Sequence, residues 1–160
     1  DFHRNGTLDI LVSIMSYNGG QLPRDEIRSI LEMRYVMMAF ALESAIPLIT
    51  PERFDQLKAK CEAFYHAASA EEAANRIYEF DHMLSGFSDN TLLPLIFCSF
   101  RDPIKELWRR YVSRYGVEGL HRRNCELLEF IEKKDVEAAK RLIEDSVNET
   151  ISGSTEIYGI

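Results

Sequence analysis

The segment Ile77–Asn90, which reads IYEFDHMLSGFSDN, decides the fold of this chain. Its apolar residues Ile77, Phe80 and Leu84 recur at steps of three and four residues, which is the spacing of one face of an α-helix. Asp81 lies on the same face. An unpaired carboxylate in a helical core would lower stability or would be neutralised by a shift in its pKa. The segment therefore predicts a core helix whose inward carboxylate needs a partner on another helix.

The composition is that of a single globular domain. Of the 160 residues, 46% are hydrophobic and 28% are charged, a balance that supports a buried core and excludes a disordered chain. No apolar run approaches the roughly 20 residues that a membrane-spanning helix needs, and the N-terminus lacks the apolar core of a signal peptide. The net charge of −7 argues against a basic face for nucleic-acid phosphates. We therefore expect a cytoplasmic domain that binds neither membrane nor DNA itself.

Helical periodicity covers most of the chain, and no strand-like alternation extends beyond a few residues. Prolines, glycines and cap residues divide the pattern into helices. The expected helices occupy residues 7–17, 23–46, 51–64, 77–87, 92–115 with a kink at Pro103, 120–134 and 136–151. The sequence thus predicts an all-α fold, an antiparallel bundle of six to seven helices around a central ligand cavity.

Four of these helices carry one polar side chain each on an otherwise apolar stripe. These residues are Arg34, Asp81, Asn124 and Ser146. In one hypothesis, Arg34 and Asp81 form an internal ion pair and the backbone satisfies the other two. In the other, the helices surround a cavity and the four groups converge on a ligand. Periodicity alone favours the first hypothesis, because satisfied internal polar networks are common.

Other residues with chemical potential give weaker signals. Cys61, Cys98 and Cys125 are widely spaced without a CxxC motif, so we expect reduced cytosolic thiols rather than disulfides or metal ligands. No histidine lies four residues from another and no HExxH motif occurs, so no helical zinc site is expected. A third hypothesis makes Asp81 a general base, but no nucleophile motif accompanies it, and we expect no enzyme.

An arginine cluster surrounds Trp108 in the sequence. Its members are Arg101, Arg109, Arg110, Arg114, Arg122 and Arg123. Such a cluster on helices is more often a solvated face or a subunit contact than a phosphate site. We interpret Trp108 as a core or interface residue rather than as a ligand platform.

The order of four segments resembles the C-terminal effector-binding and dimerisation domain of GntR-type transcriptional regulators, in the FadR/FCD group. The segments are GTLDIL at 6–11, ILEMR at 30–34, FDHMLSGFSDN at 80–90 and HRRNCELLEFIEKKDVEAAKRLIEDSV at 121–147. They are similar to the family's ExR helix, its FHxxLxxxSxN helix and its final helix pair, HxxIxxAIxxGDxxxA. The likeness covers nearly the whole chain.

Many members of this group hold a metal with one Asp and three His. Matching the motifs places these four ligand positions on Ile77, Asp81, Asn124 and Ser146, so all four ligands are replaced. A carboxylate, an amide and a hydroxyl do not make a competent transition-metal site. The resemblance therefore implies a metal-free, FadR-like branch that takes an organic effector and needs no cofactor.

The resemblance also implies the organisation of the chain. Residues 1–19 would be a linker helix from a missing N-terminal winged helix-turn-helix domain that contacts DNA. Residues 20–152 would be the effector-binding and dimerisation domain of a homodimer, and residues 153–160 a tail. The chain begins without Met, as a piece of a longer protein would. The alternative is a ligand-free dimerisation module with an internal Arg34–Asp81 pair.

The expected effector is a small organic molecule: an acyl-CoA, a fatty acid or an organic acid. Arg34 would bind its carboxylate or phosphate through paired donors. Asp81, Asn124 and Ser146 would contact hydroxyl, amide or amine groups, and Met38 would suit an acyl tail. The complete set of expected effector-binding residues is Arg34, Asp81, Asn124, Ser146, Met38 and Ile77.

Overall fold

The computed structural model describes residues 13, 22–153 and 157. In chain order the elements of residues 22–153 are α3 (Arg24–Ala45), the 3-10 helix η1 (Ile46–Leu48), α4 (Pro51–Tyr65), α5 (Ala70–Gly86), α6 (Leu93–Ser99), α7 (Arg101–Tyr115), α8 (Glu118–Glu132) and α9 (Val136–Ile151). This described part contains seven α-helices and no strand, which confirms the predicted all-α bundle. The linker helix expected in residues 1–19 lies, apart from Ser13, outside the described residues.

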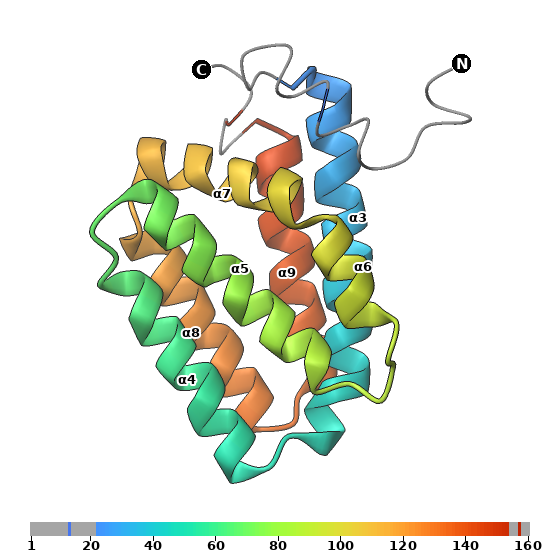
Figure 1. Ribbon diagram of the computed structural model, residues 1–160. Coiled ribbons are helices and arrows are strands. Elements are labelled where there is room, and N and C mark those ends of the chain that lie inside the picture. The colour runs from blue at the N-terminus through green and yellow to red at the C-terminus, as the bar shows by residue number, and fades with distance from the viewer. Residues whose placement is uncertain (1–12, 14–21, 154–156, 158–160) are drawn as a thin grey trace.

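The helices pack as two antiparallel groups joined by a crossing helix. Figure 1 shows α4 and α5 running antiparallel in front of α8, while α3 and α9 run antiparallel to each other beside them. Helix α7 crosses one end of the bundle and packs on α5. This arrangement brings α3, α7, α8 and α9 around one end of the interior.

One continuous apolar core connects all the helices of the described part. Its largest fully buried side chains come from several elements and include Met38 in α3, Phe64 in α4 and Phe80 in α5. Burying each of these side chains contributes roughly 1.5–3 kcal/mol. The core is therefore the main source of stability and fixes the positions of the polar side chains embedded in it.

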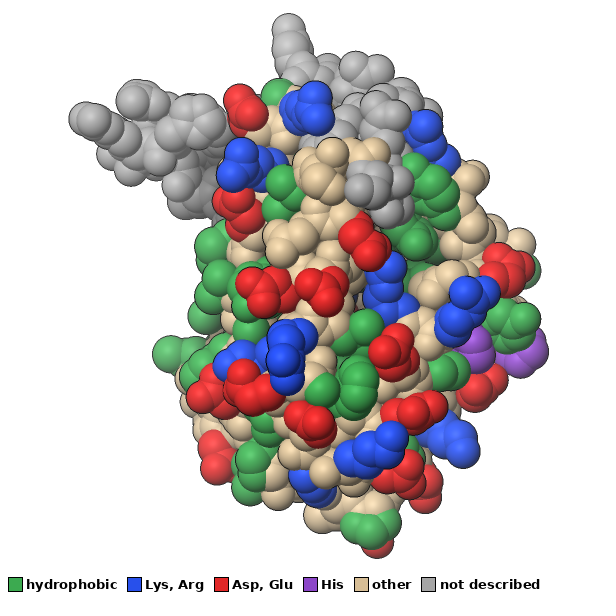
Figure 2. Space-filling model, turned by 180° about the vertical axis from the view of Figure 1, so that it is seen from behind, with side chains coloured by type: hydrophobic (Ala, Val, Ile, Leu, Met, Phe, Trp, Pro, Cys, Tyr) green, Lys and Arg blue, Asp and Glu red, His purple; other side chains and the backbone are tan. Residues whose placement is uncertain are grey.

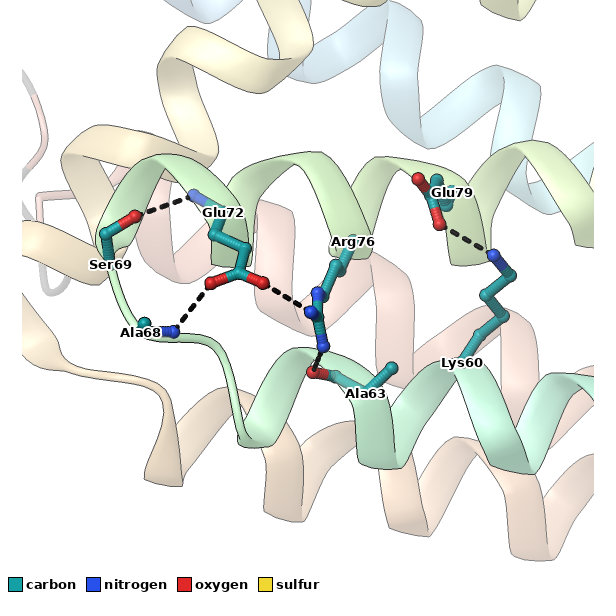
Figure 3. Close-up of polar contacts among 7 residues, drawn as sticks. All are labelled: Lys60, Ala63, Ala68, Ser69, Glu72, Arg76 and Glu79. Carbon is teal, nitrogen blue, oxygen red and sulfur yellow. Dashed lines mark hydrogen bonds and ion pairs between the residues drawn. The ribbon is translucent and has the colours of Figure 1, made fainter.

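Helix α5 begins earlier than the sequence analysis expected. The expected start of this helix at residue 77 is wrong, because Ser69 caps the helix and α5 starts at Ala70. Ser69 Oγ accepts a hydrogen bond from the Glu72 backbone N–H at 3.1 Å. Glu72 Oε2 accepts one from the Ala68 backbone N–H at 2.8 Å, as Figure 3 shows. This is a variant of the Ser-x-x-Glu capping box, in which the Glu72 carboxylate accepts from the residue before the cap rather than from the N–H of Ser69 itself.

Polar side chains also join α4 to α5 on their outer side. Arg76 of α5 forms an ion pair with Glu72 and donates to the Ala63 carbonyl of α4 at 2.6 Å (Figure 3). Lys60 of α4 contacts Glu79 of α5 at 2.6 Å. Each exposed ion pair of this kind contributes little to the free energy of unfolding. Their main effect is to align the two helices.

The expected helix over residues 92–115 is divided in two. The break lies at Phe100, between α6 and α7, rather than at Pro103. Asn90 Oδ1 accepts from the backbone N–H groups of Leu92 and Leu93 and so caps α6. Pro103 lies in the first turn of α7, where its missing N–H leaves no intrahelical bond unmade.

The surface shows no segregation of charge on the face seen in Figure 2. Lys and Arg side chains are interspersed there with Asp and Glu. None of the helices in the described residues combines the length and the apolar character needed to cross a membrane.

Candidate functional site

A buried ion pair joins α3 to α5. Arg34 donates through both Nε and Nη2 to the same oxygen of Asp81, Oδ2, at 3.1 and 2.8 Å. The two side chains are only 9% and 3% exposed. The internal pair that the ligand-free hypothesis requires is therefore present.

Trp108 of α7 completes this cluster. The Arg34 guanidinium carbon lies 4.5 Å from the centre of the Trp108 ring, a cation–π contact. Burial raises the pKa of Asp81, and the Arg34 guanidinium opposes that rise, with help from the Trp108 N–H. Within the described part of the chain, Trp108 Nε1 is buried and makes no hydrogen bond of good geometry. Trp108 Nε1 is thus a buried donor that Asp81 satisfies only weakly.

A small cavity lies beside Arg34, between α3, α7, α8 and α9. Its volume is about 30 Å³, counted as the space open to the centre of a water molecule. Apolar side chains form most of its wall, and the polar and aromatic lining residues are Arg34, Trp108, Tyr111, Arg123, Ser146 and Thr150. This space holds about two water molecules, whereas pockets for organic ligands span roughly 300–1,000 Å³. An organic effector therefore requires the cavity to widen.

Arg123 of α8 forms the more accessible wall of the cavity. It donates through Nη1 to Ser146 Oγ and through Nη2 to Glu149 Oε2, the latter at 2.9 Å. The Arg123 side chain is 25% exposed and that of Glu149 is 51% exposed. A guanidinium on each side, Arg34 and Arg123, gives the cavity two cationic groups.

The structure brings together only some of the expected site residues. Arg34 and Ser146 line the cavity, and Asp81 contacts Arg34. Met38 and Ile77 do not line it; they are buried in the apolar core, with 0% and 1% of their surface exposed.

Asn124 was expected to face the ligand together with the other polar residues, but it does not line the cavity. Its side chain is buried. No hydrogen bond of its amide is found within the described residues. The ligand-free hypothesis expected the backbone to satisfy the Ser146 hydroxyl. Instead, Arg123 donates a hydrogen bond to it.

Among the polar and aromatic lining residues, sequence analysis missed four: Trp108, Tyr111, Arg123 and Thr150. A signal for Arg123 was present, because it lies three residues after Leu120 and four before Leu127, on the buried face of α8. The solvated-face interpretation holds for four exposed members of the arginine cluster, which are Arg101, Arg109, Arg114 and Arg122. Arg110 differs, since it is buried and pairs with Glu106 at 2.8 Å.

A separate group of potential metal ligands lies between α4 and α8. Cys61 of α4 and His121 and Cys125 of α8 place one ligand atom each within 4.8 Å of one another. The interpretation of the cysteines as scattered thiols is therefore incomplete. His121 and Cys125 are four residues apart on one helix, a pairing that a search for histidine pairs alone does not find.

A sequence model of the FCD domain matches residues 29–149, well over half of the chain and all the helices around the cavity. The chain belongs to the FCD domain family. FCD domains are the effector-binding and dimerisation domains of GntR-family regulators, and the family is not enzymatic. Comparison with curated proteins and with solved structures gave no match in either case.

Within this FCD domain, the metal-free branch remains a prediction. The positions that the resemblance assigns to metal ligands contain Ile77, Asp81, Asn124 and Ser146, and Asp81 is engaged by Arg34. The Cys61–His121–Cys125 group lies at other positions and none of its members lines the cavity.

Proposed function

We propose that this FCD domain senses a small organic acid, whose carboxylate binds in the cavity between Arg34 and Arg123. The observation that carries the proposal is the presence of two guanidiniums and the Ser146 hydroxyl in one mostly apolar cavity. A few polar groups converging in an apolar pocket are typical of small-molecule sites. Arginine presents paired donors that match a carboxylate.

Both arginines have donor capacity for a ligand. Asp81 takes Nε and Nη2 of Arg34, and Nη1 makes no hydrogen bond within the described residues. Arg123 is held by Ser146 and by Glu149, and the Glu149 carboxylate is half exposed. A ligand carboxylate would replace Glu149 as the partner of Arg123, exchanging a solvated ion pair for a more buried one.

The size of the cavity favours a small acid over the acyl-CoA and fatty acid that were also expected. Its apolar wall includes Leu31, Ile104 and Leu107, and its aromatic wall includes Trp108 and Tyr111. A short acid with an apolar or aromatic group suits this lining. Widening of the cavity upon binding would separate α9 from α7, and a ligand that binds the wider arrangement better would shift the population towards it.

We propose that this shift acts on a DNA-binding domain that precedes residue 1 in a cytoplasmic homodimer. Exposed apolar side chains lie on the neighbouring helices α3 and α6: Met33, Val36 and Phe40 on α3, and Leu95 and Ile96 on α6. Surface patches of this kind often mark contacts between proteins. We assign this face to the dimer contact.

A thermal-shift series with small mono- and dicarboxylic acids tests the sensor proposal. An acid that binds the folded domain raises its melting temperature. The Arg123→Gln variant should lose this response, whereas Arg122→Gln, on the exposed neighbouring position, should retain it. The absence of stabilisation by every acid in the panel would overturn the proposal.

The ligand-free dimerisation module remains the second candidate. The buried Arg34–Asp81 pair and the small cavity favour it. Arg34→Ala should destabilise the domain under both hypotheses. In a ligand-free module, however, no acid should raise the melting temperature. The response to ligand, and not the cost of the substitution, separates the two.

A further inference from the structure

We infer that Cys61, His121 and Cys125 form a binding site for a thiophilic divalent metal, of which zinc is the best match. The three side chains come from two packed helices, α4 and α8. Two thiols and an imidazole are ligands that zinc prefers in proteins. A metal there would tie α4 to α8.

The distances suit a tetrahedral ion. Bonds of about 2.3 Å to sulfur and about 2.0–2.1 Å to nitrogen require ligand atoms about 3.5–3.8 Å apart at tetrahedral angles. Cys125 Sγ lies 3.6 Å from His121 Nε2 and 3.9 Å from Nδ1, and the three ligand atoms all lie within 4.8 Å of one another. The separations suit an ion, and the imidazole must turn so that one ring nitrogen faces it.

Glu62 lies next to the fourth coordination position. Its Oε1 is 3.4 Å from His121 Nε2, close to the separation of two ligand atoms on one zinc ion. Its side chain is 51% exposed, so it has freedom to turn towards the sulfurs. We assign Glu62, or a water molecule on the same solvent side, to this position.

Aromatic rings pack around the imidazole. The His121 ring lies 4.3 Å from the Tyr65 ring and 5.9 Å from the Phe64 ring, measured between centroids. Cys61 is completely buried, so the site has one ligand in the core and two nearer the surface.

The site is independent of the effector cavity. None of its three ligands lines the cavity. Its positions also differ from Ile77, Asp81, Asn124 and Ser146, where the family resemblance places metal ligands. Because the ligands come from two packed helices, a bound metal would stabilise the contact between α4 and α8.

Titration of the reduced, metal-stripped 160-residue chain with Co²⁺ tests this inference. We expect one Co²⁺ per chain, a thiolate-to-cobalt charge-transfer band, and displacement of Co²⁺ by Zn²⁺. Cys125→Ser and His121→Gln should each weaken binding by about 100-fold or more, since even outer-shell changes cost 10–100-fold. Circular dichroism of the metal-free variants establishes that they fold.

Cys98→Ser is the matched control. Cys98 Sγ of α6 also contacts a histidine, His82 Nε2 of α5 at 3.3 Å, but Cys98 is exposed and, within the described residues, this pair is not part of a three-ligand group. Its substitution should leave Co²⁺ affinity unchanged. Absence of the charge-transfer band would overturn the inference. So would equal losses in the Cys98 and Cys125 variants, or a Cys61–Cys125 disulfide found by mass spectrometry in the protein as purified, before reduction.

Discussion

Two polar clusters lie inside the same bundle, and they satisfy their side chains in different ways. Arg34 and Asp81 carry opposite charges and contact each other at 2.8 Å, and Arg34 also lines a cavity. Cys61, His121 and Cys125 form a compact group of potential ligands in the packed interface of α4 and α8. The chain itself balances the charges of the first cluster, whereas we propose that a bound ion completes the second.

The largest expected effect comes from breaking the charged cluster. Arg34→Met leaves the Asp81 carboxylate buried without its cation, which should cost about 3–5 kcal/mol of unfolding free energy. The double variant Arg34→Met/Asp81→Leu should recover most of this loss, because an apolar pair replaces a buried ion pair at little cost. Urea unfolding measures both. A single-variant cost below about 1 kcal/mol, typical of a surface pair, would contradict the account.

Zinc should stabilise the second cluster without involving the first. At a free concentration 100 times its Kd, zinc should add about 2.7 kcal/mol to the free energy of unfolding. The gain should disappear in Cys125→Ser and persist in Arg34→Met/Asp81→Leu. If the double variant lost its stabilisation by zinc, the two clusters would not be independent.

The α5 capping box offers a reference outside both clusters. Ser69→Ala removes the acceptor for the Glu72 backbone N–H and should cost about 1 kcal/mol. Thermal or urea unfolding measures this loss. The loss of unfolding free energy should be the same with and without zinc. If zinc abolished the loss, the stability of the α5 cap would depend on the metal site.

The smallest effect concerns acid stability at the same cap. The Ala68 backbone N–H lowers the pKa of Glu72 below its ordinary value of 4.5. The contribution of Glu72 is therefore complete above about pH 4.5 and is lost as the pH falls through the lowered folded-state pKa. Glu72→Gln should flatten the acid limb of a stability–pH profile measured by urea unfolding. An acid limb as steep as that of the wild type would show that Glu72 has no role there.

Helix bounds were predicted correctly where the cap residue and the apolar stripe of a helix are both clear in its own sequence. Helix α9 spans Val136–Ile151 as predicted, because the Asp135 cap and the apolar stripe lie on the same helix. The start of α5 was missed because Ser69 is within an Ala-, Ser- and Glu-rich stretch that also suits a turn. Pro103 suggested a kink, but a helix start accommodates it equally well.

The cavity residues were predictable only where a polar side chain, as of Arg34 or Ser146, interrupted an apolar stripe. Arg34 and Asp81 were identified because a buried charge is costly and needs a partner. Cys61 escaped notice because cysteine on an apolar stripe resembles any other core residue. Its proximity to Cys125 depends on the packing of α4 against α8, which periodicity within one helix does not contain.

The fluorescence of Trp108 provides the most direct test of the effector cavity. Trp108 is the single tryptophan of the chain and lines the cavity beside Arg34. Titration with small organic acids should give a saturable change in its emission in the wild type and in Arg122→Gln, and none in Arg123→Gln. An emission that stays constant across the acid panel, or that changes equally in Arg123→Gln, would contradict the account.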